Sequence, residues 1–398
     1  RISSSISIKS LLNKQFLLKD LKISTKSIKI KDFFPFIRMI NNDPKIYIAE
    51  NFIKKGFIIA DLNIEFDNNG NIKENYQING YVKDGKINLF KKYDLSKIDF
   101  FFDIKKNNFE LVNFNLSIND KNFLATNVKI IKQKNKFLVS GKFSNEKTIL
   151  STSEIKDLLN TDTTDLDIDK IEFESDNTFS FNIDKKFKFE NLEINSSIFL
   201  NNLIFLNDFG LKKIFPEFNK EFILKDHKIS LNYSQNILNI EGQGNFFIKD
   251  EDKIDYKITK SVNKVDFNST IKVSNNLLEI DFLNYQNNDK SNLKINIKGN
   301  KDLKGNIFFE KISLNESKNN INIKNLLLKH DYSIEKFEKI DLDYLDKEKI
   351  ENKFSIIRKD QNYILNGKSL NANKLIESLL ESENKKKKLF SNDFRLNI

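Results

Sequence analysis

The sequence contains neither cysteine nor tryptophan, and only two histidines, three prolines and 11 glycines occur among its 398 residues. Without cysteine it has no disulfide framework and no thiolate metal site. Without tryptophan, a sugar cleft of the glycosidase kind is disfavoured. The two histidines, His227 and His330, lie about a hundred residues apart. Two separated histidines disfavour a catalytic triad and a histidine-rich metal site. Each is expected to be a turn or surface histidine.

Arginine is also scarce. Only four arginines accompany 62 lysines, although the formal net charge is +10. Recognition of phosphates and base edges favours the planar guanidinium group. Acidic side chains number 56 and are mixed with the basic ones along the whole chain. We therefore expect a solvated lysine surface and no nucleic-acid partner.

Long apolar runs are missing as well. No stretch reaches the ~18–20 apolar residues that a membrane-spanning helix needs. The chain begins at Arg1 in the middle of a pattern, which suggests a fragment of a longer protein. Any membrane anchor would then lie outside it.

The sequence does contain strand after strand of alternating apolar and polar residues. Ile58, Ala60, Leu62, Ile64 and Phe66 share one phase, and polar residues dominate the other. Side chains of a strand alternate between its two faces, so each run has one apolar face and one wet face. The pattern predicts a mostly β protein of roughly 25–30 short strands. We expect an elongated, curled, largely antiparallel sheet, because very wide open sheets do not stay flat.

Asparagine and aspartate form the expected turns, as in the stretch from Asp67 to Gly70. Short amphipathic helices are predicted at 32–41, 153–160, 208–218 and 373–383. We expect a first β segment over residues 1–150 with a short helix near 32–41. A second β segment follows over 151–370, and a short helix with a lysine-rich tail over 371–398.

Motifs for catalysis are not found. Gly242-Gln243-Gly244 lies between strands and does not open a helix, so it is no phosphate-binding loop. The alternating acids Asp165, Asp167 and Asp169 lack the glycine turn and distal glutamate of a calcium loop. We expect no enzyme activity, no catalytic residues, no metal site and no cofactor.

The function of the protein therefore depends on how the apolar faces of its strands are covered. They either close on each other as a dry core or remain open as an apolar trough. An open trough would bind acyl chains, because each methylene removed from water contributes about 0.8 kcal/mol. A structural or adhesive surface protein with a sealed core and no ligand is the alternative.

Two patches resemble the AsmA-like superfamily, the YhdP/TamB-type bridge-like lipid-transfer proteins of Gram-negative bacteria. The first joins Asp32-Phe33-Phe34-Pro35, the stretch from Tyr47 to Gly56 and the alternating run from Phe57 to Phe66. The second is the stretch from Leu365 to Ala372 that leads into Leu375, Ile376 and Leu379. Together they cover about a fifth of the chain.

The resemblance implies a β-groove that transfers phospholipid or another acyl lipid without catalysis and serves outer-membrane biogenesis. It also implies a periplasmic protein, anchored to the inner membrane through a segment outside this chain, with membranes at the ends of the full-length protein. Partner proteins stay unknown. The candidate groove-lining residues are Ile58, Leu62, Ile64, Phe66, Phe100, Phe102, Ile104, Phe181, Ile183, Leu231, Tyr256, Ile258, Phe282 and Ile297.

Overall fold

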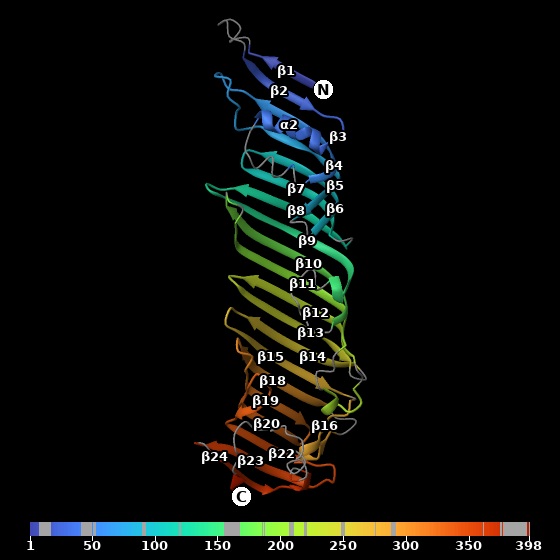
Figure 1. The fold of residues 1–398 in the computed structure, drawn as a ribbon, viewed down its shortest axis with the longest axis vertical. Helices are drawn as coiled ribbons and strands as arrows, with labels where there is room; N and C mark the ends of the chain where they lie inside the picture. Colours follow the sequence, from blue (N-terminus) through green and yellow to red (C-terminus); the bar gives the residue numbers. More distant parts are fainter. Residues whose placement is uncertain are drawn as a thin grey trace. The chain divides into compact units, whose positions relative to one another are not determined.

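The computed structural model shows a mostly β protein (Figure 1). It describes all residues except 8–16, 41–49, 51–52, 90–92, 119–120, 155–167, 185, 187, 207–210, 219–220, 248–250, 275, 288–291, 361, 375, 377–395 and 398. Twenty-three strands belong to one sheet, and β16 with β17 forms a separate two-stranded sheet. Every pairing with a described register is antiparallel, except that of β24 with β25. The predicted mostly β, largely antiparallel fold is confirmed.

The chain divides into two compact units. Unit 1 comprises Arg1–Thr148 and Glu174–Ser196, and unit 2 comprises Ile149–Phe173 and Ser197–Ile398. The predicted boundary at residue 150 is thus close to Thr148, but the segment Glu174–Ser196 belongs with the first unit. Strands β9 (Lys136–Ser151), β10 (Ile168–Asp184) and β11 (Phe189–Phe205) contain residues of both units.

Unit 1 is a meander, in which each long strand pairs with its neighbour in the chain. Its one described α-helix, α2 (Ile30–Ile40), agrees with the predicted helix at 32–41 and contacts β4. The remaining elements are β1 (Ile2–Ile6), β2 (Leu18–Ser24), β3 (Ile28–Lys29), β4 (Ile53–Glu65), β5 (Gln77–Leu89), β6 (Tyr93–Lys105), β7 (Asn108–Ile118) and β8 (Lys121–Lys132).

Unit 2 continues the same sequential pairing, interrupted by one insertion between β15 and β18. The insertion contains the two-stranded sheet and the 3₁₀ helix η2 (Asp281–Leu283). The strands are β12 (Phe222–Ser234), β13 (Ile237–Phe247), β14 (Glu251–Lys260), β15 (Lys264–Val273), β16 (Glu279–Ile280), β17 (Tyr285–Gln286), β18 (Leu293–Asp302), β19 (Ile307–Glu316), β20 (Asn319–Leu328), β21 (Ile334–Lys336), β22 (Lys339–Leu345), β23 (Glu351–Lys359), β24 (Asn362–Ser369) and β25 (Leu396–Asn397).

The number of strands agrees with the predicted range, but many of the strands are longer than predicted. The described residues form 25 strands, of which β10 and β11 each have 17 residues. The expected helix at 208–218 is a 3₁₀ turn, η1 (Leu211–Lys213), followed by turns around Pro216. A proline ring prevents continuation of a helix, which explains this difference. Most of the helices expected at 153–160 and 373–383 lies outside the described residues.

Aspartate side chains close several of the hairpins in the same way. The Asp67 Oδ1 atom accepts hydrogen bonds from the backbone N–H groups of Asn69 and Asn71, both at 2.8 Å. Asp302 Oδ1 accepts equivalent bonds from Lys304 and Asn306, at 2.8 and 2.9 Å. This side-chain mimicry of a turn supports a tight reversal, and Gly70 and Gly305 adopt the left-handed conformation that the same two turns require. The turn predicted from Asp67 to Gly70 is confirmed at the first of these hairpins.

Candidate functional site

An unbroken row of apolar or very small residues crosses ten strands of unit 2. We call it the isoleucine row. Each member faces the next across one strand pairing, and every member is half-buried. From β12 to β24 its residues are Ile229, Gly242, Tyr256, Ser269, Ile297, Ile312, Ile323, Ile340, Ile356 and Leu365. Nine steps of ~4.8 Å give the row a length of roughly 43 Å.

A second row runs beside the first, two residues away along most strands and three residues away along β19 and β20, where the bulge at Glu310 adds one. We call it the flanking row. Its members pair in register in the same way, and the ring centroids of Phe267 and Phe309 lie 5.8 Å apart. The flanking row consists of Leu231, Ile240, Ile258, Phe267, Gly299, Phe309 and Leu326.

Both rows follow from alternation and from short turns. Residues of one phase share a face, and a hairpin of fixed length brings the same phase of the next strand opposite. A bulge at Lys298 and Gly299 absorbs one extra residue, Glu310, and keeps Ile297 facing Ile312 and Gly299 facing Phe309. The apolar face therefore continues across β18 and β19 without a polar interruption.

The neighbouring part of the same face is sealed. Val273, Leu293 and Leu314 are buried in a core cluster together with Leu278 and Tyr285. The last two belong to the segment 276–287, which we call the cover. The other buried members are Phe215 and Phe218 from the turn before β12, and Ile321, Leu342, Tyr344 and Phe354 from β20, β22 and β23. The described apolar face of unit 2 thus consists of a dry part under the cover and a mostly half-buried part along the two rows. Gly299 and Leu326 of the flanking row are buried, and the C-terminal members of the isoleucine row, Ile340, Ile356 and Leu365, pack against the core cluster.

Polar bonds at the edge of the cluster hold the cover in place. The Tyr285 hydroxyl donates to Glu316 Oε2 at 2.6 Å, and Asn319 Nδ2 donates to the same oxygen at 2.9 Å. The Tyr344 hydroxyl donates to the backbone carbonyl of Leu283 at 2.8 Å. Burial raises the pKa of the Tyr285 phenol far above its ordinary value, and the bond to Glu316 raises it further. The buried carboxylate is consequently provided with donors, as a buried charge requires.

Unit 1 has a comparable row across eight strands, β1, β2 and β4 to β9. Its members are Ile2, Ile23, Leu62, Ile78, Ile104, Phe109, Ile130 and Val139. Helix α2 covers the adjacent part of this face, where Ile30 and Phe33 pack against the buried cluster of Ile58, Val82 and Phe102. In unit 1, as in unit 2, a sealed cluster and a row of mostly half-buried residues occupy one face.

The predicted lining residues separate into three groups. The first group lies on the rows. Leu62 and Ile104 belong to the row of unit 1, Tyr256 and Ile297 to the isoleucine row, and Leu231 and Ile258 to the flanking row. Ile58, Ile64 and Phe102 are buried, and Phe66, Phe100, Phe181 and Ile183 are half-buried. Phe282 differs from the prediction, because it lies in η2 of the cover with 49% of its surface exposed. The short stretch from Phe282 to Tyr285 was not separable from a strand by its apolar residues alone.

Several members of the rows escaped the sequence prediction. Ile312, Ile323 and Ile340 share the apolar phase of their strands, but a single sequence does not reveal which residues face each other across a pairing. The glycines within strands were also missed as part of this face. Isolated glycines in a strand signal a bulge or a close approach of neighbouring groups, and that signal was available at Gly242 and Gly299.

His227 corrects a prediction, because it is not a surface histidine. It is fully buried on the apolar face, where its Nδ1 lies 3.3 Å from the Tyr256 hydroxyl and its Nε2 lies 2.9 Å from the Asn245 carbonyl oxygen. A carbonyl only accepts hydrogen bonds, so Nε2 carries the proton and Nδ1 accepts from the tyrosine. Burial also raises the pKa of the Tyr256 phenol to about 12.

We expect His227 to make the stability of unit 2 depend on pH. Burial lowers the pKa of its imidazole, against smaller opposing effects of the Asn245 carbonyl and Asp226. The unfolded chain, with a histidine pKa of ~6.5, then binds the proton more readily, so stability is complete above that pH and is lost as the pH falls below it. Denaturant unfolding at pH 7.5 and 5.5 should show a decrease of at most ~1.4 kcal/mol per pH unit. His227→Gln should show a smaller loss of unfolding free energy between pH 7.5 and 5.5, whereas the exposed control His330→Gln should show the wild-type loss. An equal loss in both variants would contradict an origin in His227.

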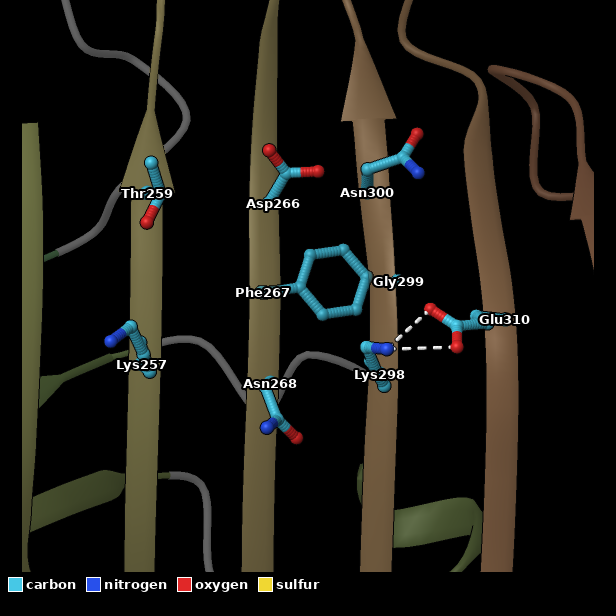
Figure 2. Close-up of a pocket in the computed structure, with 9 residues that line it drawn as sticks. All are labelled: Lys257, Thr259, Asp266, Phe267, Asn268, Lys298, Gly299, Asn300 and Glu310. Atoms are coloured by element: carbon cyan, nitrogen blue, oxygen red, sulfur yellow. Dashed lines mark hydrogen bonds and ion pairs between the residues drawn. The ribbon is translucent and has the colours of Figure 1, made fainter. Parts of the chain in front are cut away.

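A shallow hollow of about 320 Å³ lies on strands β14, β15, β18 and β19 (Figure 2). The charged groups that line it have both signs, and Lys298 Nζ forms an ion pair with Glu310 at 2.7 Å. Lys257 is likewise paired, with Glu241. With mixed and neutralised charges, this hollow offers no electrostatic preference for an anion or a cation.

No group of three or more histidine or acidic side chains with metal-binding spacing occurs among the residues with described positions. Within those same residues, no helix has the length and apolarity to cross a membrane. No protein-family model, curated protein or solved structure matches the chain.

Proposed function

We propose that this chain is a non-enzymatic lipid-transfer protein that carries acyl chains along the apolar rows of its sheet. The isoleucine row supports this proposal most directly. It crosses ten strands in register, with glycine and serine as its only members that are not large and apolar. Those two residues are small and introduce no charge. Such a surface offers an acyl chain similar surroundings at each successive strand.

The energetics favour movement along such a surface. Each methylene that leaves water contributes about 0.8 kcal/mol. An acyl chain that slides from one strand to the next exchanges one set of apolar contacts for an equivalent set. The barrier at each step is therefore much smaller than the cost of complete transfer into water, and no catalytic group is required.

The contrast between the rows and the cover argues for a ligand over a uniformly sealed core. Leu278 and Tyr285 of the cover are 1% and 0% exposed, whereas all members of the isoleucine row retain an intermediate exposure. A purely structural protein would gain stability by sealing the rest of this face as well. The resemblance to the AsmA-like superfamily agrees with the proposal. It extends the proposal to a periplasmic location, an inner-membrane anchor outside this chain and a role in outer-membrane biogenesis.

Native mass spectrometry of the purified chain tests the proposal directly. The expected result is a set of adducts with phospholipid masses, which organic extraction removes and added phosphatidylglycerol restores. A second arm measures transfer of a fluorescent phospholipid from donor to acceptor vesicles of phosphatidylethanolamine and phosphatidylglycerol. A protein that binds no phospholipid and accelerates no transfer would instead support the structural or adhesive alternative.

A further inference from the structure

Two glycines in the middle of β13 lie beneath aromatic rings from the neighbouring strands. Gly242 faces Tyr256 of β14 across the pairing, and a Cβ atom built on Gly242 would lie only 2.8 Å from the Tyr256 Cε2 atom. A Cβ atom on Gly244 would lie 2.5 Å from Cγ of His227, which comes from β12. Each ring therefore occupies the space directly above a glycine Cα.

Hydrogen bonds hold these two rings in place. The Tyr256 hydroxyl and His227 Nδ1 are 3.3 Å apart, and the ring centroids are separated by 5.8 Å. The other histidine nitrogen, Nε2, contacts the Asn245 carbonyl of the strand between them. The rings are thus tied to each other and to β13.

The same arrangement recurs at other strand glycines of the apolar faces. In unit 2, Figure 2 shows the Phe267 ring reaching from β15 to Gly299 of β18, where an added Cβ atom would lie 3.0 Å from Phe267 Cζ. In unit 1, the corresponding distance from Gly80 to Phe102 Cζ is 2.6 Å, and that from Gly141 to Phe179 Cζ is 2.9 Å. At these three glycines a backbone carbonyl oxygen lies at least as close to the added Cβ atom as the ring does, so the closeness of the neighbouring strand also favours glycine there.

A ring that lies over a glycine occupies little height above the sheet. Side chains of a strand normally stand roughly perpendicular to the sheet, and a tyrosine in that orientation would project well beyond the neighbouring isoleucines. Here the far edge of the Tyr256 ring is at the level where an alanine methyl group would be. The apolar face therefore stays low at β13, although two large side chains meet there.

We infer that Gly242 keeps the isoleucine row passable at β13, because it lets the half-buried Tyr256 ring lie flat beneath a moving acyl chain, while Gly244 makes room for the fully buried His227. This inference rests on the proposed lipid-transfer function. Gly242 is the positioning residue that determines the clearance, and Tyr256 is the side chain that would block the row if it were raised.

Gly242→Val tests the inference cleanly, since the three atoms nearest to an added Cβ atom all belong to the flexible end of Tyr256 and none to the backbone. The variant should transfer fluorescent phosphatidylglycerol between vesicles about tenfold more slowly than the wild type. This is the effect expected if the raised ring removes roughly two methylene groups of the acyl chain from contact with the sheet as it passes β13. Tyr256→Ala alone is the reference variant, because it removes one member of the row and adds no side chain at Gly242. Gly242→Val with Tyr256→Ala should transfer at the rate of Tyr256→Ala and clearly faster than Gly242→Val, because valine alone is no taller than its isoleucine neighbours.

The double variant separates clearance from stability, because a structural defect caused by the valine would persist after the ring is removed. Gly242→Ala provides the same comparison with a smaller side chain if the valine variant does not fold. Wild-type transfer rates in Gly242→Val or Gly242→Ala, or a double variant as slow as Gly242→Val, would overturn the inference and leave the proposed function standing. A wild-type protein without bound lipid or transfer activity would overturn the proposed function itself.

Discussion

Replacing Ile297 and Ile312 together with aspartate is expected to reduce phospholipid transfer by at least tenfold and to leave the fold intact. The two residues face each other across β18 and β19 in the middle of the isoleucine row. Both retain an intermediate exposure, so the new carboxylates keep part of their hydration in the absence of lipid. A passing acyl chain would have to remove that water without supplying hydrogen bonds, and uncompensated burial of a charged group is strongly unfavourable.

The matched control places the same two carboxylates on the opposite face of the same strands. Lys294 and Asn315 also face each other across β18 and β19, and they alternate with the apolar residues. Lys294→Asp with Asn315→Asp should transfer phospholipid at nearly the wild-type rate. Vesicle transfer measures both variants, and far-ultraviolet circular dichroism verifies their folding. Equal transfer by wild type, test variant and control would contradict a lipid path along this row.

Leu278→Ala is expected to have the largest effect on stability. Leu278 is a residue of the cover that is 1% exposed in the core cluster, and its backbone N–H also bonds to Asn287 Oδ1 at 2.7 Å. Truncating a leucine at such a position costs about 2–5 kcal/mol, from lost burial and from the cavity that remains. Urea unfolding should show this decrease as a lower midpoint.

Ile258→Ala on the flanking row provides the comparison. Ile258 is only half-buried and is not a member of the core cluster, so the same kind of truncation should cost clearly less than Leu278→Ala, about 1–2 kcal/mol. If both substitutions destabilised the protein equally, the flanking row would behave as sealed core. The lipid path would then lose its main structural support.

The architecture was predictable because alternation is a local property. The runs around Ile58 and Ile297 define strands with one apolar face, and the stretch from Asp67 to Gly70 marks a turn, without any knowledge of the partner strands. The register between strands was not predictable. It depends on bulges such as the one at Lys298 and Gly299, which shift a pairing by one residue and decide whether two apolar side chains face each other.

Which parts of the apolar face are sealed and which are half-buried was also not predictable from the sequence. Ile58 and Ile297 have the same alternating surroundings, yet Ile58 is buried in the cluster under α2 and Ile297 lies on the half-exposed row. The difference arises from α2 and from the cover, which pack onto the sheet from elsewhere in the chain. His227 illustrates the same point, since its polar neighbours Asp226 and Lys228 predicted a turn and the structure places it inside a strand.

Sequential pairing has one more consequence, for the growth of such a protein. Within each unit almost every strand bonds only to the strands before and after it in the chain. Contacts that are local in sequence form quickly and need no distant segment. Adding or deleting a whole hairpin would lengthen or shorten an apolar row without rethreading the chain, so the distance that such a protein reaches can change in steps of two strands during evolution.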